Sequence, residues 1–293
     1  MTDDAGVHLG ANRYGKSGIR LATVHRDGDR HTFTDLEVEV RLTGAFTAAH
    51  VDGDNAAVLP TDTMRGTCFA LARDGITSVA DYARALTARF LAASPAVDRA
   101  TVEVTALPWE RLEVDGAPHA HTFRPAAGGA AVVTVTAARD AAPVLTGGLR
   151  GGRVLKTTGS AFTGFLVDEL TTLPPADDRI MATTVDATWG FVDGTADVDT
   201  LNAEVPGTAL ARFATHDASA SVQHTLWEMG RAVLTAHGEV AWIRFRMPNE
   251  HHILADLSAY DRDNPGEVFL VADRPYGVIE GTVVRDGHDG PAA

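Results

Sequence analysis

Residues 31–42 have the sequence His-Thr-Phe-Thr-Asp-Leu-Glu-Val-Glu-Val-Arg-Leu, and their pattern decides the fold class. From residue 36 onward every second side chain is Leu or Val, while Glu37, Glu39 and Arg41 occupy the positions between. Successive side chains of a β-strand point to opposite faces of the sheet. The alternation therefore predicts an antiparallel strand with one face in the core and the other in solvent.

The same alternation recurs in four further segments. They cover residues 101–107, 131–137, 181–191 and 240–247. A sheet that is apolar on one face must cover that face with another layer. The chain therefore needs helices to complete its core.

Two segments have helical periodicity instead. In residues 78–93 apolar side chains recur every three or four positions, and Ser78 followed by Asp81 resembles an N-terminal capping pair. Residues 219–237 show the same spacing, and Gly238 is the predicted C-terminal cap. These two helices are expected to cover the predicted sheets.

The order of strands, one long helix and more strands occurs twice along the chain. This repeat of architecture predicts an α+β fold with two similar halves, joined near the Gly-, Ala- and Pro-rich stretch at 139–152. We expect a first domain at 8–142 and a second at 143–286. Residues 1–7 and 287–293 are expected to be flexible tails.

Composition limits the classes of function. The chain has 25 Lys and Arg against 39 Asp and Glu, a formal net charge of −14. This balance argues against non-specific nucleic-acid binding and against a polybasic membrane surface. No apolar run reaches membrane-spanning length, and neither an N-terminal signal core nor a C-terminal Ser-Lys-Leu address is present. A cytoplasmic, bacterial enzyme is the expectation.

Cys68 and the histidines offer little chemistry by themselves. Cys68 is the single cysteine, which excludes an intramolecular disulfide, and its apolar surroundings predict an inert buried thiol. His251 and His252 are adjacent, so on a strand they would point to opposite faces and could not easily bind one metal ion. No glycine-rich phosphate loop with a strand and helix around it is found.

Several short motifs, taken together and in order, resemble the urate oxidase (uricase) family. They are Tyr-Gly-Lys at 14–16, Pro-Thr-Asp-Thr at 60–63, the run 156–169 with 178–180 and 185–189, Ser-Val-Gln at 221–223 and Pro-Asn-Glu-His at 248–251, with 108–123 as a further segment. The resemblance extends over nearly the whole chain. It implies two tandem tunnelling-fold (T-fold) halves, each an antiparallel sheet packed against helices. It also implies assembly into a homotetramer around a β-barrel tunnel, with active sites at subunit interfaces.

The resemblance further implies a set of substrate-binding residues. Arg179 and Gln223 would clamp the edges of urate, because a guanidinium offers a planar fork of donors. Phe162 would stack on the purine. The other implied contacts are Thr61, Asp62, Leu173, Ser221, Val222 and Asn249. Taken alone, Arg179 resembles a surface charge, Phe162 a core residue, and Ser221 with Gln223 a helix cap.

The implied reaction needs no metal or organic cofactor. Urate and O2 are the substrates, with water, and 5-hydroxyisourate and H2O2 are the products. Lys16 is the implied base, assisted by Thr61 and His251, while Asn249 would hold O2. A lysine can act as a base only if burial or neighbouring charges lower its pKa. In the family the Lys and Thr come from one subunit and the clamp from its neighbour.

Two other classes of protein remain open. A cyclohydrolase-like enzyme of the same fold would typically need a metal cluster of His and Cys, which a single cysteine disfavours. A non-catalytic purine-binding protein would have lost its base. The presence of Lys16, Thr61, Asn249 and His251 argues against that class.

Overall fold

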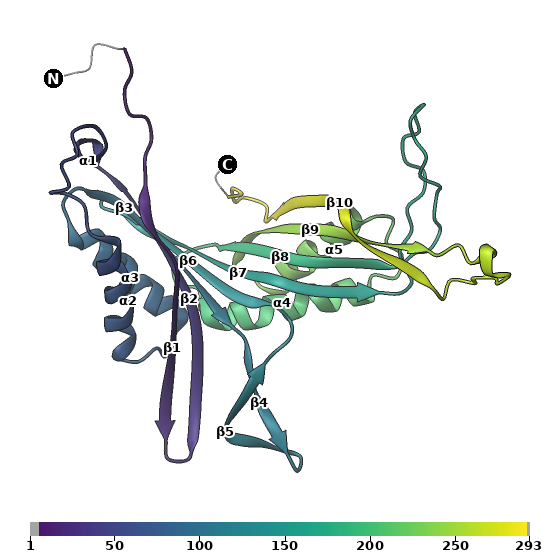
Figure 1. The fold of residues 1–293 in the computed structure, drawn as a ribbon, viewed down its shortest axis with the longest axis horizontal. Helices are drawn as coiled ribbons and strands as arrows, with labels where there is room; N and C mark the ends of the chain where they lie inside the picture. Colours follow the sequence, from purple (N-terminus) through teal and green to yellow (C-terminus); the bar gives the residue numbers. More distant parts are fainter. Residues whose placement is uncertain (1–5, 292–293) are drawn as a thin grey trace. The chain divides into compact units, whose positions relative to one another are not determined.

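The computed structural model describes residues 6–291, which divide into two compact units (Figure 1). The first unit extends to Gly147 and includes Asp197–Asp199, and the second contains Gly148–Ala196 and the chain from Thr200. Both combine antiparallel strands with helices, which confirms the α+β class. The predicted domain boundary between residues 142 and 143 stays a prediction. Strand β7 (Ala141–Lys156) continues through this boundary and also through the division between the two units after Gly147. Parts of the predicted tails, residues 1–5 and 292–293, lie outside the described residues.

Four antiparallel strands form the sheet of the first unit. Their order is β1 (Tyr14–Asp27), β2 (Arg30–Gly44), β3 (Val97–Leu107) and β6 (Ala130–Ala138). The register aligns Val38 with Val104, and Val104 with Val133, so that buried residues meet on one face. The strands predicted at 31–42, 101–107 and 131–137 are thereby confirmed.

Helices α1 (Thr47–Val51), α2 (Thr61–Arg73) and α3 (Val79–Ala93) complete this unit. The capping prediction for α3 is confirmed, because Ser78 Oγ accepts a hydrogen bond from the Asp81 N–H at 2.9 Å. Figure 1 shows α2 and α3 side by side along the sheet.

The expectation of one long helix per half is wrong for the first unit. Helix α2 is a second one, and its buried residues Met64, Cys68 and Ala72 recur every four positions. Its glycine and three threonines weaken the helical signal. The motif at 60–63 forms the start of this helix, with Pro60 as its N-cap.

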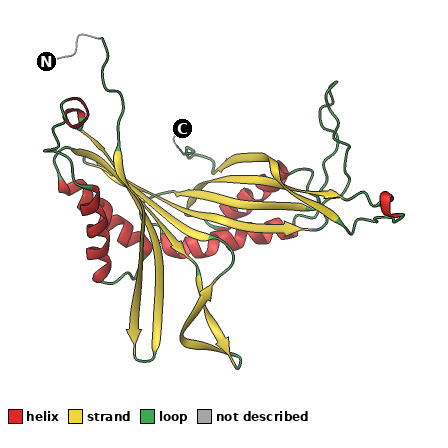
Figure 2. Cartoon of the chain, in the orientation of Figure 1, coloured by secondary structure: helices red, strands yellow, loops and turns green. Residues whose placement is uncertain are grey.

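A two-stranded hairpin of β4 (Trp109–Val114) and β5 (Ala117–Pro125) forms a separate ribbon in the first unit (Figure 2). Its turn residues Asp115 and Gly116 both have positive φ angles, 52° and 77°, as tight hairpin turns require. The Trp109 Nε1–H donates to Asp35 of β2 at 3.0 Å, which fastens the hairpin to the sheet.

Strands β8 (Met181–Phe191), β9 (Val240–Leu254) and β10 (Phe269–Val284) form the antiparallel sheet of the second unit. Helices α4 (Val198–Thr215) and α5 (Val222–Ala236) supply apolar side chains to the same core. The core includes the fully buried side chains of Trp189, Met229, Ile243, Phe245 and Met247. The strands predicted at 181–191 and 240–247 are confirmed, and β9 continues through the 248–251 motif.

Two helix predictions for the second unit are wrong. Helix α5 ends at Ala236 and its C-cap is His237, whose N–H donates to Val233 O at 2.9 Å, so Gly238 is not the cap. Helix α4 is a second long helix, which the sequence pattern did not predict because Pro206 and Gly207 lower helix propensity in its middle. Packing of its apolar face into the core overrides that local preference.

Candidate active site

The predicted site residues form two groups, one in each unit. Lys16, Thr61 and Asp62 belong to the first unit. The second unit carries the residues predicted to clamp and stack on the substrate, together with two residues of β9: Phe162, Leu173, Arg179, Ser221, Val222, Gln223, Asn249 and His251.

Lys16 lies in β1 at a place where β1 approaches β2 closely. It pairs with Val40, and the register shifts directly after it, with Gly18 at a φ of +66°. A Cβ on Gly15 would lie only 1.8 Å from Val40 O, so the glycine is required for this approach. The half-buried Lys16 side chain lines a depression of about 510 Å³ together with Arg65 and Phe69 of α2.

Tyr14 connects the Lys16 strand to the loop that precedes Thr61. Its hydroxyl oxygen accepts a hydrogen bond from the Leu59 N–H at 2.9 Å, and its ring packs edge-on against Phe46 at 4.8 Å. Burial raises the pKa of Tyr14, so the group remains a neutral hydroxyl. The structure therefore brings the 14–16 and 60–63 motifs together.

The start of α2 presents unpaired backbone donors. Its N-cap residue, Pro60, makes no side-chain cap, and the first helical hydrogen bond runs from Met64 N to Pro60 O at 3.2 Å. The N–H groups of Thr61, Asp62 and Thr63 thus have no partner within the helix. The Asp62 carboxylate pairs with Arg65 at 2.7 Å, which leaves the Asp62 backbone as its available donor.

Phe162 and Arg179 lie together in the second unit. The Arg179 Cζ is 5.2 Å from the centroid of the Phe162 ring. Within residues 6–291 the Arg179 side chain has no hydrogen bond or ion pair, and its Nε is buried without a partner. Burial also lowers the pKa of Arg179. A desolvated, unpaired cation favours an anionic ligand.

The loop that follows Phe162 is largely open. Phe165 stacks on Phe162 with centroids 4.9 Å apart and planes inclined by 15°. Beyond it, the side chains of Leu166, Leu170 and Leu173 are 91%, 81% and 57% exposed. Leu173, one of the implied substrate contacts, is thus largely exposed in this chain, and its role stays a prediction.

The first turn of α5 is capped by its own sequence. Ser221 Oγ accepts a hydrogen bond from the His224 N–H at 3.1 Å. Val222 is buried in the core, whereas Gln223 is exposed. The helix start is thus fixed, and the Gln223 side chain is free to meet a ligand.

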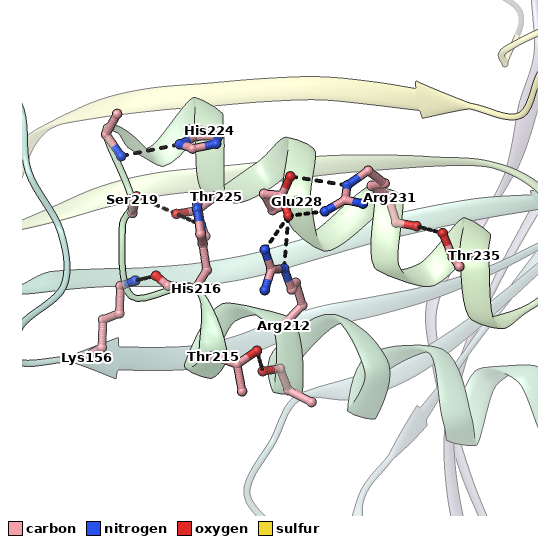
Figure 3. Close-up of polar contacts among 12 residues, drawn as sticks. Lys156, Arg212, Thr215, His216, Ser219, His224, Thr225, Glu228, Arg231 and Thr235 are labelled. Atoms are coloured by element: carbon pink, nitrogen blue, oxygen red, sulfur yellow. Dashed lines mark hydrogen bonds and ion pairs between the residues drawn. The ribbon is translucent and has the colours of Figure 1, made fainter.

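A buried polar network supports this turn (Figure 3). The hydroxyls of Ser219 and Thr225 lie 2.6 Å apart, and the Thr225 hydroxyl is 3.3 Å from His216 Nδ1. Lys156 Nζ donates to the His216 carbonyl at 2.6 Å. Burial lowers the pKa of His216, which favours the neutral ring. Because Ala161 N donates to Ser219 O at 2.7 Å, the network also holds the segment before Phe162.

Asn249 and His251 project from one side of β9. They are two residues apart, and the intervening Glu250 points to the other side. Its carboxylate accepts hydrogen bonds from Thr184 at 2.7 Å and from Arg153 at 2.8 Å. Glu250 thereby fixes the part of β9 that carries Asn249 and His251.

The described residues contain neither a cluster of metal ligands nor a membrane-spanning helix. Across residues 6–291 no three His, Cys, Asp or Glu side chains are arranged to hold a metal ion. No helix in that range is long and apolar enough to cross a membrane. Cys68 is buried, as predicted, and burial raises its pKa to about 12.

Sequence reasoning missed several supporting residues. Tyr14 and Asp178 lie in the quoted motifs, but their hydrogen bonds join them to residues 45 and 20 positions away, so the motifs do not show what these side chains hold together. Glu250 could have been found, because strand alternation already places it opposite Asn249 and His251.

These features define a class of protein. A half-buried arginine whose Nε is buried without a partner, an aromatic ring and a helix N-terminus occur in one unit of an α+β protein. Together they can bind a flat anion by edge hydrogen bonds, stacking and the positive end of the helix.

Comparison with known proteins identifies the family. A profile of the family described as Uricase matches residues 12–136 and 145–280. A uricase from Arthrobacter globiformis is 41% identical over 282 residues, which cover 96% of this chain and 91% of that protein. A Danio rerio uricase is 34% identical over 289 residues, 97% of each chain. The crystal structure of Arthrobacter globiformis uricase matches with a TM-score of 0.92 and 38% identity, covering 98% of both chains.

The chain belongs to the uricase family, and it is a urate oxidase enzyme. The predicted tunnelling-fold class is confirmed by the same likeness. Assembly into a closed tunnel, and the roles of the individual site residues, stay predictions.

Proposed function

We propose that this enzyme converts urate, O2 and water to 5-hydroxyisourate and H2O2 without a metal or organic cofactor. Urate gives two electrons to O2, which becomes peroxide, and water supplies the hydroxyl group of the product. The observation that carries the proposal is the unpaired guanidinium of Arg179 beside the Phe162 ring. Arg179 supplies a positive charge and a fork of hydrogen-bond donors for a purine anion, and Phe162 supplies a stacking surface.

Binding of urate uses its edges and one face. Arg179 and Gln223 hydrogen-bond to the edges, and the first N–H groups of α5, near Ser221 and Val222, favour the negative charge. Stacking of Phe162 on the purine adds about 1–3 kcal/mol, by analogy with base stacking on aromatic residues. Leu173 provides an apolar wall.

Proton removal makes urate a stronger reductant. Lys16 takes the second proton from urate, assisted by the Thr61 hydroxyl and by His251 as a relay. Asp62 contributes its backbone to substrate binding, and Asn249 holds O2 and then the attacking water. No step requires a cofactor, because urate is itself the reductant.

The complete site is assembled between subunits of a homotetramer. One subunit contributes Lys16 and Thr61, and its neighbour contributes the clamp and the stacking ring. The uncapped N-terminus of α2 supports a site shared between subunits, because its first N–H donors have no partner in the helix. We further propose a cytoplasmic location, with neither nucleic acid nor membrane as a partner.

The test uses purified, chelator-treated protein with urate. Loss of ultraviolet absorbance, O2 uptake and peroxide formation should match in amount without any added cofactor. Activity that returns only when a metal is added would contradict the cofactor-free reaction. Urate binding without O2 uptake would instead identify a non-catalytic purine-binding protein.

A further inference from the structure

We propose that Asp178 is a positioning residue that holds Phe162 and Arg179 in a fixed relation for urate binding. This inference rests on the proposed function, because that function assigns both residues to the urate site. Asp178 itself need not touch the substrate.

The Asp178 carboxylate bonds to both segments that carry these residues. Its Oδ2 accepts a hydrogen bond from Thr158 Oγ1 at 2.6 Å, and its Oδ1 accepts one from Ser160 N at 3.2 Å. The same Oδ1 accepts the backbone N–H of Arg179 at 3.0 Å. One side chain therefore joins the segment leading to Phe162 with the residue that supplies the clamp.

These bonds hold the carboxylate in its charged form. The Thr158 hydroxyl, followed by nearby backbone N–H groups, lowers the pKa of Asp178 below its ordinary value. An ionised carboxylate is a stronger acceptor than a neutral one. The attachment is therefore present throughout the neutral pH range.

Among residues 6–291, Phe162 has one other backbone attachment to the Arg179 segment. Its N–H donates to Ala176 O at 2.7 Å, and the Ala176 N–H donates back at 3.0 Å. A single pair of backbone hydrogen bonds would let the two segments rotate about it. The second attachment, at Asp178, restricts this rotation. The 163–175 loop contacts Phe162 through the stacked Phe165 ring, while its three leucines are exposed.

Asp178 also leaves the Arg179 guanidinium free. In the described part of the chain the two neighbouring side chains form no ion pair, since the carboxylate binds other donors. The Arg179 charge thus stays available to an anionic ligand. Asp178 orders the backbone of the clamp without neutralising it.

The adjacent Asp177 provides a matched control. It is exposed like Asp178 and makes no hydrogen bond or ion pair among residues 6–291. Asp177→Ala removes the same charge one position away and breaks no contact. A difference between Asp177→Ala and Asp178→Ala therefore reports the contacts of Asp178, namely its hydrogen bonds and its charge interaction with Lys156, and not merely the loss of one negative charge from this segment.

The experiment compares urate oxidation by the assembled wild-type enzyme with four variants. For Asp178→Ala we expect KM for urate to rise about tenfold or more, with kcat within about threefold. Asp178→Asn keeps one oxygen for the two N–H donors, and Thr158→Val removes only the hydroxyl, so both should give intermediate KM values. Asp177→Ala should match wild type. The inhibition constant of xanthine, a purine lacking one oxygen of urate, should rise in the same order.

Each outcome decides the inference. A wild-type enzyme that leaves urate unchanged would overturn both the proposed function and the role of Asp178. An active wild type with equal KM values for Asp178→Ala and Asp177→Ala would overturn only the Asp178 role, as would a fall in kcat at unchanged KM. If Asp178→Ala unfolds, wild-type KM values in Asp178→Asn and Thr158→Val would overturn it.

Discussion

The first turns of α2 and α5 both carry proposed urate-site residues, yet they are held in different ways. In α5 the Ser221 hydroxyl caps the helix, and a buried network beneath it includes Ser219 and Thr225. In α2 the N-cap is Pro60, which has no side-chain cap, and one Tyr14 bond fastens the preceding loop. In α5 a side chain thus caps one of the first N–H groups, that of His224, whereas no side chain caps the start of α2.

The same contrast extends to the strands beside these helices. Glu250 fixes the part of β9 that carries Asn249 and His251 through bonds to Thr184 of β8 and Arg153 of β7. Lys16 instead lies at a register shift in β1. We infer that the proposed site residues of the second unit, His251 included, are preorganised, while Lys16 and Thr61 of the first unit depend on their assembled surroundings. Variants of the two groups should therefore change different kinetic constants.

The largest expected effect tests the proton-transfer group. Lys16→Met should lower kcat by about 100- to 10,000-fold, the usual contribution of a general base, while KM changes little. The neighbouring Ser17→Ala, which loses one exposed bond to Glu39, is the control and should keep wild-type kcat. Steady-state urate oxidation measures both. A raised KM at normal kcat in Lys16→Met would make Lys16 a binding residue and remove the contrast.

The next effect tests the binding group. Arg179→Ala should raise KM for urate by about tenfold to a hundredfold, because a hydrogen bond to a charged group contributes about 1.5–3 kcal/mol. Arg179→Lys keeps the charge but loses the planar fork, so its KM should be intermediate. Titration with urate under anaerobic conditions gives the binding constant directly. Equal binding by all three proteins would contradict the clamp.

A third prediction compares ion pairs in the two units. Glu228 of α5 is 8% exposed and accepts hydrogen bonds from Arg212 at 3.0 Å and Arg231 at 2.7 Å, which lower its pKa to about 2. Glu228→Gln should lower the free energy of unfolding by about 1.5–3 kcal/mol at neutral pH. The exposed Asp62–Arg65 pair should matter little, so Arg65→Gln should stay within about 0.5 kcal/mol of wild type.

The pH dependence of this stabilisation has a definite sign. Because folding lowers the pKa of Glu228, the stabilisation is complete above the ordinary carboxyl range and is lost as pH falls towards 2. Urea unfolding at several pH values should show the Glu228→Gln deficit shrinking below pH of about 4.5. A deficit independent of pH in that range would show that the charge of Glu228 is not the cause.

The smallest effect tests the helix caps themselves. Ser221→Ala should lower the free energy of unfolding by about 0.5–2 kcal/mol, the usual cost of losing a cap. Thr63→Ala in the first turn of α2 removes a side chain that caps nothing, so it should change stability by less than about 0.5 kcal/mol. Chemical unfolding measures both. Equal losses would mean that the two turns are held alike.

The fold was predictable where the pattern was local and strong. The strands at 31–42 and 181–191 and the Ser78 cap follow from alternation and spacing that neighbouring residues display. Helices α2 and α4 were not predicted, because tertiary packing overcomes weak local propensity in both. The prediction of Gly238 as the cap was wrong because the C-cap is His237, one residue earlier. His237 has an extended conformation, which needs no glycine.

The candidate site was predictable only as a set of residue types. Motif resemblance selects Arg179, Phe162 and Gln223, but it does not reveal that Arg179 Nε is buried and unpaired. The supporting residue Asp178 binds Thr158, which is 20 positions away, and Glu250 binds Thr184, which is 66 positions away.

Local sequence alone thus determined the strand and helix types of the segments with clear periodicity, and the family motifs. Side-chain periods of two and of 3.6 are properties of the backbone, which each segment carries by itself. Only the tertiary structure decided which polar groups are buried, paired or left open. Burial and hydrogen bonding depend on distant segments meeting, and it is their meeting that leaves Arg179 unpaired beside Phe162.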